Sequence, residues 1–166
     1  MKALLLSLAA AATVLTAAAQ TALPTDVTLK TLDGAEFPSA DLARAEGATI
    51  VALWATWCAP CKKELDVYSD YYQTWKDEYG AELYAVSIDR KSAVKKIPAM
   101  VESKGWAFPV LTDETSGMLS ALQIRSIPQI YIVDADGAVI YEHAGYSPGD
   151  EEKVRKVLEN SAGGAK

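Results

Sequence analysis

The chain has 166 residues, of which 50% are hydrophobic and 23% are charged, with two cysteines and a formal net charge of −6. Its apolar content is too high for an intrinsically disordered chain, and its length predicts one domain with a core of its own. The negative charge argues against binding to nucleic acid or an anionic membrane, and two cysteines are too few for a multi-bridge scaffold or a four-thiolate zinc site.

Residues 1–19 have the pattern of a secretory signal peptide. An early lysine precedes an apolar run from Ala3 to Leu15, and Ala17 and Ala19 fit the A-x-A cleavage pattern. We expect cleavage at that point, with an uncleaved N-terminal membrane anchor as the alternative. Either outcome places the protein in the periplasm or outside the cell, in an oxidising compartment.

Residues 20–160 are predicted to form one α/β domain, followed by a flexible tail over 161–166. Alternating residues over 27–31 and the Asp33-Gly34 turn predict an opening hairpin-like unit. The further predicted strands are 49–54, 83–88, 108–111, 129–133 and 138–143, and short helices are predicted at 41–45, 92–104 (broken by Pro98), 116–122 and 150–160. Strands alternating with helices predict a central sheet covered on both faces.

A long helix is predicted directly after the cysteine pair. Its apolar side chains are spaced by three, four, three and four residues, at Leu65, Tyr68, Tyr72, Trp75 and Tyr79. This spacing favours a helix face packed on the sheet over an aromatic binding surface, and a glycine ends the helix at position 80.

Cys58 and Cys61 lie between the apolar strand 49–54 and that helix. Haem attachment would need His where Lys62 stands, and a zinc site could recruit only one histidine, His143. A purely structural disulfide would close a very short loop and stabilise the fold little. A redox pair explains the position best, because the helix N-terminus stabilises a thiolate on the first cysteine and leaves the second close enough to resolve a mixed disulfide.

The sequence Trp57-Cys-Ala-Pro-Cys61 after a buried strand resembles the W-C-x-P-C active site of the thioredoxin fold. Ser126-Ile127-Pro128 before a strand resembles the second signature of that family, a cis-proline loop facing the cysteines. The resemblance covers about residues 47–160 and implies a central mixed β-sheet flanked by helices. It also implies that Pro128 is cis, and that the substrate-binding residues are Trp57, Pro60, Ile127 and Pro128.

Within this superfamily the chain resembles the exported TlpA/ResA-like branch, because of its signal peptide, its N-terminal β-hairpin and the helix–strand insert over about 92–111. Glu64, three residues after Cys61, resembles a glutamate beside the active site of ResA-type reductases. The alternative is an acidic residue favoured by the helix dipole. Classical thioredoxins carry a buried aspartate where this chain has Ala52, so Glu64 or water would take the proton of the resolving thiol.

The sequence therefore predicts an exported thiol–disulfide oxidoreductase, most concretely a reductase of protein disulfides. Cys58 attacks a substrate disulfide and Cys61 resolves the mixed disulfide, without a cofactor or a metal. The Ala-Pro dipeptide lacks the histidine found between the cysteines of strongly oxidising relatives, which favours a reductant supplied by a membrane-bound thiol donor.

The expected partners are proteins with disulfides or thiols, and the chain itself is expected to be a monomer. Three other functions stay open. One is a disulfide oxidase or isomerase, and another is a non-enzymatic peptide-binding module. The third is a peroxiredoxin-like peroxidase, although the Pro-x-x-x-Thr-x-x-Cys run of that class does not occur in the sequence.

Overall fold

The computed structural model describes residues 22–43 and 47–163. The predicted signal peptide, its cleavage point and residues 164–166 of the predicted tail lie outside these ranges. Within them, no helix has both the length and the apolar character needed to cross a membrane.

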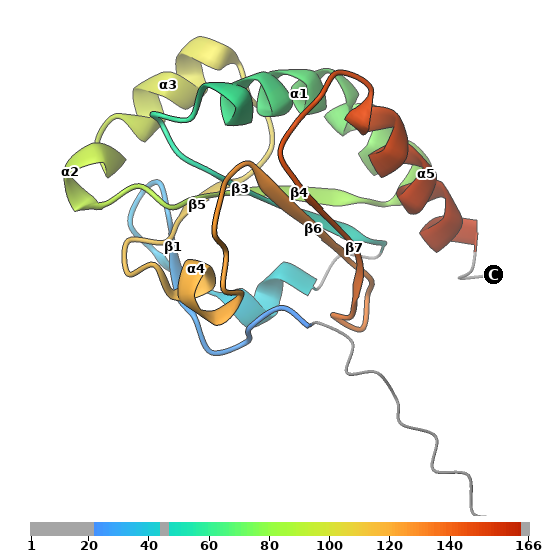
Figure 1. Ribbon diagram of the computed structural model, residues 1–166, viewed down its shortest axis with the longest axis horizontal. Helices are drawn as coiled ribbons and strands as arrows, with labels where there is room; N and C mark the ends of the chain where they lie inside the picture. Colours follow the sequence, from blue (N-terminus) through green and yellow to red (C-terminus); the bar gives the residue numbers. More distant parts are fainter. Residues whose placement is uncertain (1–21, 44–46, 164–166) are drawn as a thin grey trace, which may run out of the picture.

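In the described ranges, seven strands form one mixed sheet in the order β2-β1-β5-β4-β3-β6-β7 (Figure 1). Strands β3, β4 and β5 run parallel to one another, whereas all other neighbours in the sheet pair antiparallel. This arrangement confirms the predicted mixed sheet and its N-terminal hairpin, β1–β2. The strands are β1 (Thr28–Thr31), β2 (Glu36–Pro38), β3 (Thr49–Trp54), β4 (Glu82–Ser87), β5 (Val110–Thr112), β6 (Gln129–Val133) and β7 (Val139–Ala144).

Helices cover both faces of the sheet, as the alternation of elements predicted. Helices α1, α3 and α5 lie on one face, and α4 lies with a short 3₁₀ helix on the other (Figure 1). The α-helices are α1 (Ala59–Tyr79), α2 (Lys91–Val94), α3 (Ile97–Lys104), α4 (Gly117–Ala121) and α5 (Asp150–Gly163), and the 3₁₀ helix is η1 (Ser39–Ala43).

The helical segment predicted over 92–104 is divided into α2 and α3, which confirms the expected break. Pro98 lies in the first turn of α3, where a missing N–H costs no helical hydrogen bond. Helix α5 continues to Gly163, beyond its predicted end at Asn160, because Ser161 and Ala162 are compatible with a helix. Residues 161–163 of the predicted flexible tail are therefore helical.

The aromatic stripe on α1 packs on the sheet, as predicted. Leu65, Tyr68 and Trp75 are at most 1% exposed, and they share a cluster with the residues of β3 that point toward this helix. Burial of each such side chain stabilises the fold by roughly 1.5–3 kcal/mol. Gly80, with φ of 64°, ends the helix in the left-handed conformation that glycine adopts without strain. The long helix is thereby fixed with its N-terminus at the end of β3.

Candidate active site

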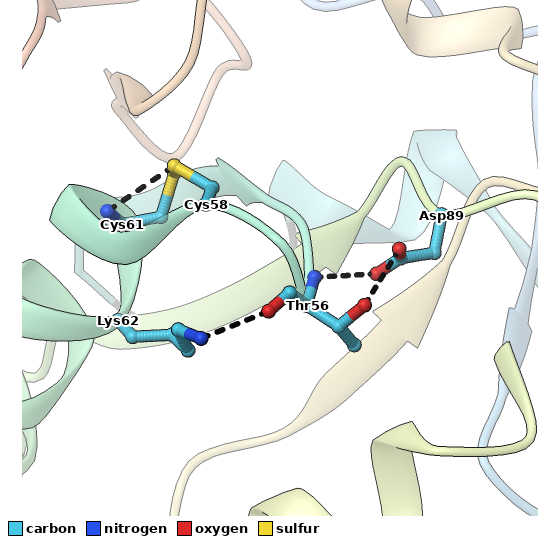
Figure 2. The surroundings of a disulfide bond; sticks show 5 residues. All are labelled: Thr56, Cys58, Cys61, Lys62 and Asp89. Carbon is cyan, nitrogen blue, oxygen red and sulfur yellow. Dashed lines mark hydrogen bonds between the residues drawn. A yellow bond between two sulfur atoms is a disulfide. The ribbon is translucent and has the colours of Figure 1, made fainter. Parts of the chain in front are cut away.

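The two cysteines form a disulfide at the N-terminus of α1. Cys58 is the N-cap residue of the helix, and its Sγ accepts a hydrogen bond from the backbone N–H of Cys61 at 3.3 Å (Figure 2). Pro60 lies in the first turn, where it removes no helical hydrogen bond. A helix N-terminus directed at a sulfur favours negative charge there, so the geometry suits a Cys58 thiolate once the bridge is reduced.

A side-chain clamp holds the loop that leads to the cysteines. Asp89, which follows β4, accepts hydrogen bonds from the backbone N–H and the hydroxyl of Thr56 (Figure 2). The Nζ of Lys62 donates to the carbonyl oxygen of Thr56 at 2.9 Å. All three polar groups of this loop residue, two positions before the first cysteine, are therefore bonded. Asp89 was not among the predicted site residues, although it directly follows the predicted strand 83–88.

The predicted substrate-binding residues differ in exposure. Trp57 is 68% exposed, and Pro60 is also exposed, so both can contact a partner protein. Ile127 is half-buried, whereas Pro128 is buried. Direct contact between Pro128 and a partner is thus more restricted than contact with the two residues beside the bridge.

The Ile127–Pro128 peptide bond is cis, which confirms the conformation that the family resemblance implied. Pro128 directly precedes Gln129, and Gln129 lies opposite Leu53 in the antiparallel pair of β6 and β3. The proline loop and the loop after β3 therefore meet at the same edge of the sheet. The fold brings the two sequence signatures together there.

Glu64 is a buried carboxyl one turn along α1 from Cys61. It is 1% exposed; its Oε1 accepts a hydrogen bond from the Tyr68 hydroxyl at 3.4 Å, and its Oε2 has no hydrogen-bond partner within the described chain. Burial raises the pKa of Glu64 to about 8, against the smaller lowering effect of the Tyr68 bond. At neutral pH this side chain is thus largely a neutral acid. Ala52, on β3, is fully buried and has no titratable side chain, so it cannot take the role of the buried aspartate of classical thioredoxins.

A second buried carboxyl, Asp150, begins α5. It accepts hydrogen bonds from the backbone N–H of Ser147 at 2.7 Å and from Lys153 Nζ at 2.8 Å, and it lies 3.2 Å from His143 Nε2. Burial would raise the pKa of Asp150, but these bonds outweigh it and hold the pKa below its usual value. Its negative charge adds slightly to the raised pKa of the Glu64 carboxyl.

The sequence model of the AhpC/TSA family matches residues 20–142, the segment that contains both the cysteine pair and the cis-proline loop. The chain belongs to the AhpC/TSA family. This membership and the relatives below agree with the thioredoxin-like fold and with the ResA-like branch that the motifs indicated.

Two relatives illustrate the similarity of this AhpC/TSA-family chain to known proteins. It is 31% identical over 107 residues to the thiol–disulfide oxidoreductase ResA of Bacillus thuringiensis subsp. konkukian, over 63% of this chain and 60% of the relative. It is 31% identical over 124 residues to the thioredoxin-like protein YneN of Bacillus subtilis, over 72% and 68% respectively. The chain thus spans about 60% of the length of this ResA relative.

A solved structure agrees with the fold. A thioredoxin-like protein from Porphyromonas gingivalis superimposes with a TM-score of 0.74 at 34% sequence identity, covering 84% of this chain and 91% of that one. The similarity therefore extends well beyond the segment around the cysteines.

Proposed function

We propose that the protein is an exported thiol–disulfide oxidoreductase that reduces disulfides in other proteins. The observation that carries the proposal is the Cys58–Cys61 disulfide at the N-terminus of α1, with the Cys61 amide directed at the Cys58 sulfur. A short-range bridge contributes little loop entropy to stability, whereas this position favours a reactive thiolate. The similarity to proteins named thiol–disulfide oxidoreductases supports the same chemistry.

The reaction starts from the dithiol form. The Cys58 thiolate attacks one sulfur of the partner's disulfide, forming a mixed disulfide, and the partner's other sulfur leaves as a thiolate that takes up a proton. The sulfur of Cys61 then attacks the Cys58 sulfur, and the second partner sulfur leaves in the same way. The partner gains two electrons and two protons, and the protein is left with the bridge seen here.

Glu64 is the proton acceptor in this proposal: its ionised carboxylate, the minor form at neutral pH because the pKa is raised to about 8, takes the proton of Cys61. Cys61 must lose its proton before its sulfur attacks, and Glu64 lies on the same helix, one turn further on. Because burial raises the pKa of Glu64 to about 8, the carboxyl keeps the transferred proton in the disulfide form. In the reverse direction the same group returns the proton to Cys61.

The partner is a protein with a disulfide, which contacts Trp57, Pro60, Ile127 and Pro128 around the bridge. Resetting the dithiol needs two electrons and two protons from a thiol donor, and an exported protein would receive them from a donor in the membrane. The Ala-Pro dipeptide between the cysteines favours the reducing direction. Equilibration with reduced and oxidised glutathione distinguishes a reductase from an oxidase, because the reductase retains its disulfide at a lower potential.

Reduction of insulin in the presence of dithiothreitol tests the activity. We expect the wild type to accelerate precipitation of the insulin chains and Cys58→Ser to fall to the uncatalysed rate. Ala99→Ser, which adds a hydroxyl at an exposed position of α3, is the control and should retain activity. Equal rates for the wild type and Cys58→Ser would refute the proposal.

A further inference from the structure

Five exposed cations gather on the elements that surround the disulfide. We call them the basic rim, and they are Lys63, Arg90, Lys91, Lys95 and Lys96. No acidic residue occurs in the sequence between Asp89 and Glu102, so the segment that carries most of the rim is purely cationic. This concentration contrasts with the net charge of −6 for the whole chain.

The rim cations also differ from most other cations of the described chain in making no ion pair. Within the described ranges, no rim side chain makes an ion pair or a hydrogen bond, and the remaining cations without an ion pair are Lys62, Arg125 and Lys156. The ion-paired cations are Lys30 with Glu114, Lys76 with Glu82, Lys104 with Asp66, Lys153 with Asp150, and Arg155 with Glu152 and Glu159.

The topology places the start of this segment at the edge of the sheet that carries the cysteine loop. Strands β3 and β4 are parallel neighbours with Trp54 opposite Ser87, so the loops that follow them leave the same edge of the sheet. The hydrogen bonds between Thr56 and Asp89 join those two loops directly (Figure 2). Arg90 is the next residue, and α2 continues from it at the same edge (Figure 1). Lys63 is exposed on α1, two residues after Cys61.

Screening by salt determines which charges on the protein surface attract a docking partner. At physiological ionic strength the Debye length is about 8 Å, so acidic groups elsewhere on the surface are screened from a chain bound at the disulfide. The rim cations make no ion pair within the described chain, and the segment that carries most of them starts at the edge of the sheet from which the cysteine loop leaves. A negative segment is therefore attracted to this edge although the whole molecule is negative.

We infer that the basic rim is the docking surface for an acidic segment of the protein whose disulfide exchanges with Cys58 and Cys61. The inference rests on the proposed function and adds the chemical class of its partner. The cations steer the acidic segment to the edge of the sheet, and the partner's cystine then meets the sulfur of Cys58.

Two model peptides test this inference. Each contains one cystine, which is flanked by aspartate and glutamate in one peptide and by glutamine in the other. At low salt we expect the dithiol form of the wild type to reduce the acidic peptide about tenfold faster, and high salt should remove the preference. The double variant Lys95→Glu/Lys96→Glu should lose the preference at low salt. The control Lys156→Glu should keep the preference. It makes the same lysine-to-glutamate change on α5, next to Arg155, which bonds Tyr79 at the end of α1 far from the cysteines.

A binding measurement keeps this inference separate from the proposed activity. The disulfide form is titrated with both peptides carrying serine in place of cysteine, and backbone NMR shifts are followed. Stronger shifts at Lys95 and Lys96 with the acidic peptide support the rim even if neither cystine peptide is reduced, an outcome that would refute only the activity. Equal reduction rates and equal NMR shifts for both peptides would overturn the inference that the rim binds an acidic segment. The inference is also overturned if the protein binds vesicles of anionic lipid and neither peptide.

Discussion

The carboxyl group of Asp89 accepts hydrogen bonds from both the backbone N–H and the hydroxyl of Thr56, at 2.7 and 2.9 Å. Ser87, at the end of β4, adds a third hydrogen bond to the same carboxyl at 2.8 Å. This group links the ends of two parallel strands and orders the loop that carries Trp57 and Cys58. Its position is a property of the strand pairing, because Trp54 and Ser87 lie opposite each other.

Substitution Asp89→Asn should slow the reaction of Cys58 more than it affects folding. The amide replaces one acceptor oxygen with a donor, so a Thr56 bond is lost and the loop can shift relative to the N-terminus of α1. We expect alkylation of the reduced Cys58 at fixed pH to slow by about tenfold, since small displacements at a reactive group are costly. The rate is measured with iodoacetamide over a range of pH.

Asp113→Asn is the matched control for that variant. Asp113 is equally buried and accepts hydrogen bonds from the N–H groups of Gly117 and Met118, but it orders α4 rather than the cysteine loop. Both variants should lose about 1–3 kcal/mol of stability. If they slow alkylation equally, or if Asp89→Asn does not slow it, Asp89 has no specific effect on the site.

Glu64→Gln should abolish a pH dependence of stability in the disulfide form. The folded protein holds the Glu64 proton up to a pKa of about 8, whereas an ordinary glutamate releases it near 4.5. The stabilisation that depends on this proton is complete below about pH 4.5 and is lost as pH rises toward 8, at no more than about 1.4 kcal/mol per pH unit. Urea unfolding at several pH values should show this decline in the wild type and not in the variant. Parallel declines in both proteins would contradict the raised pKa.

Tyr68→Phe should raise the pKa of Glu64 further. The Tyr68 hydroxyl donates to Oε1 and partly offsets the effect of burial, so its removal leaves the charged carboxylate with less stabilisation. A ¹³C NMR titration of the Glu64 carboxyl measures the shift. Tyr72→Phe is the control, because that hydroxyl bonds Glu82 and Lys76 instead. An unchanged or lowered pKa in Tyr68→Phe would contradict the prediction.

The elements around the site could be predicted from the sequence because their signals are local. The apolar run 49–54 and the strand 129–133 agree with β3 and β6, and the aromatic spacing after Cys61 gave the face of α1 that is buried. Helix ends were less well defined: α5 extends past Asn160 because nothing in the next residues stops a helix.

Features that depend on contacts between distant segments were not predictable in the same way. Asp89 and Thr56 are brought together by the register of two strands, which no periodicity in the sequence specifies. The burial of Glu64 depends on the packing of the folded chain, so from the sequence the residue could be interpreted either as a site group or as a favourable charge at a helix start. The unpaired state of the basic rim likewise follows from where the acidic residues lie in the fold.

The central claim is that Cys58 attacks the partner's disulfide and Cys61 resolves the product. Intact-mass analysis of Cys61→Ser, incubated with a cystine peptide, tests it most directly. The account predicts that in this variant Cys58 carries a stable adduct, a mixed disulfide with one cysteine of the peptide, and that Cys58→Ser forms no adduct. An adduct of equal yield on Cys61 in Cys58→Ser, or none in either variant, would contradict it.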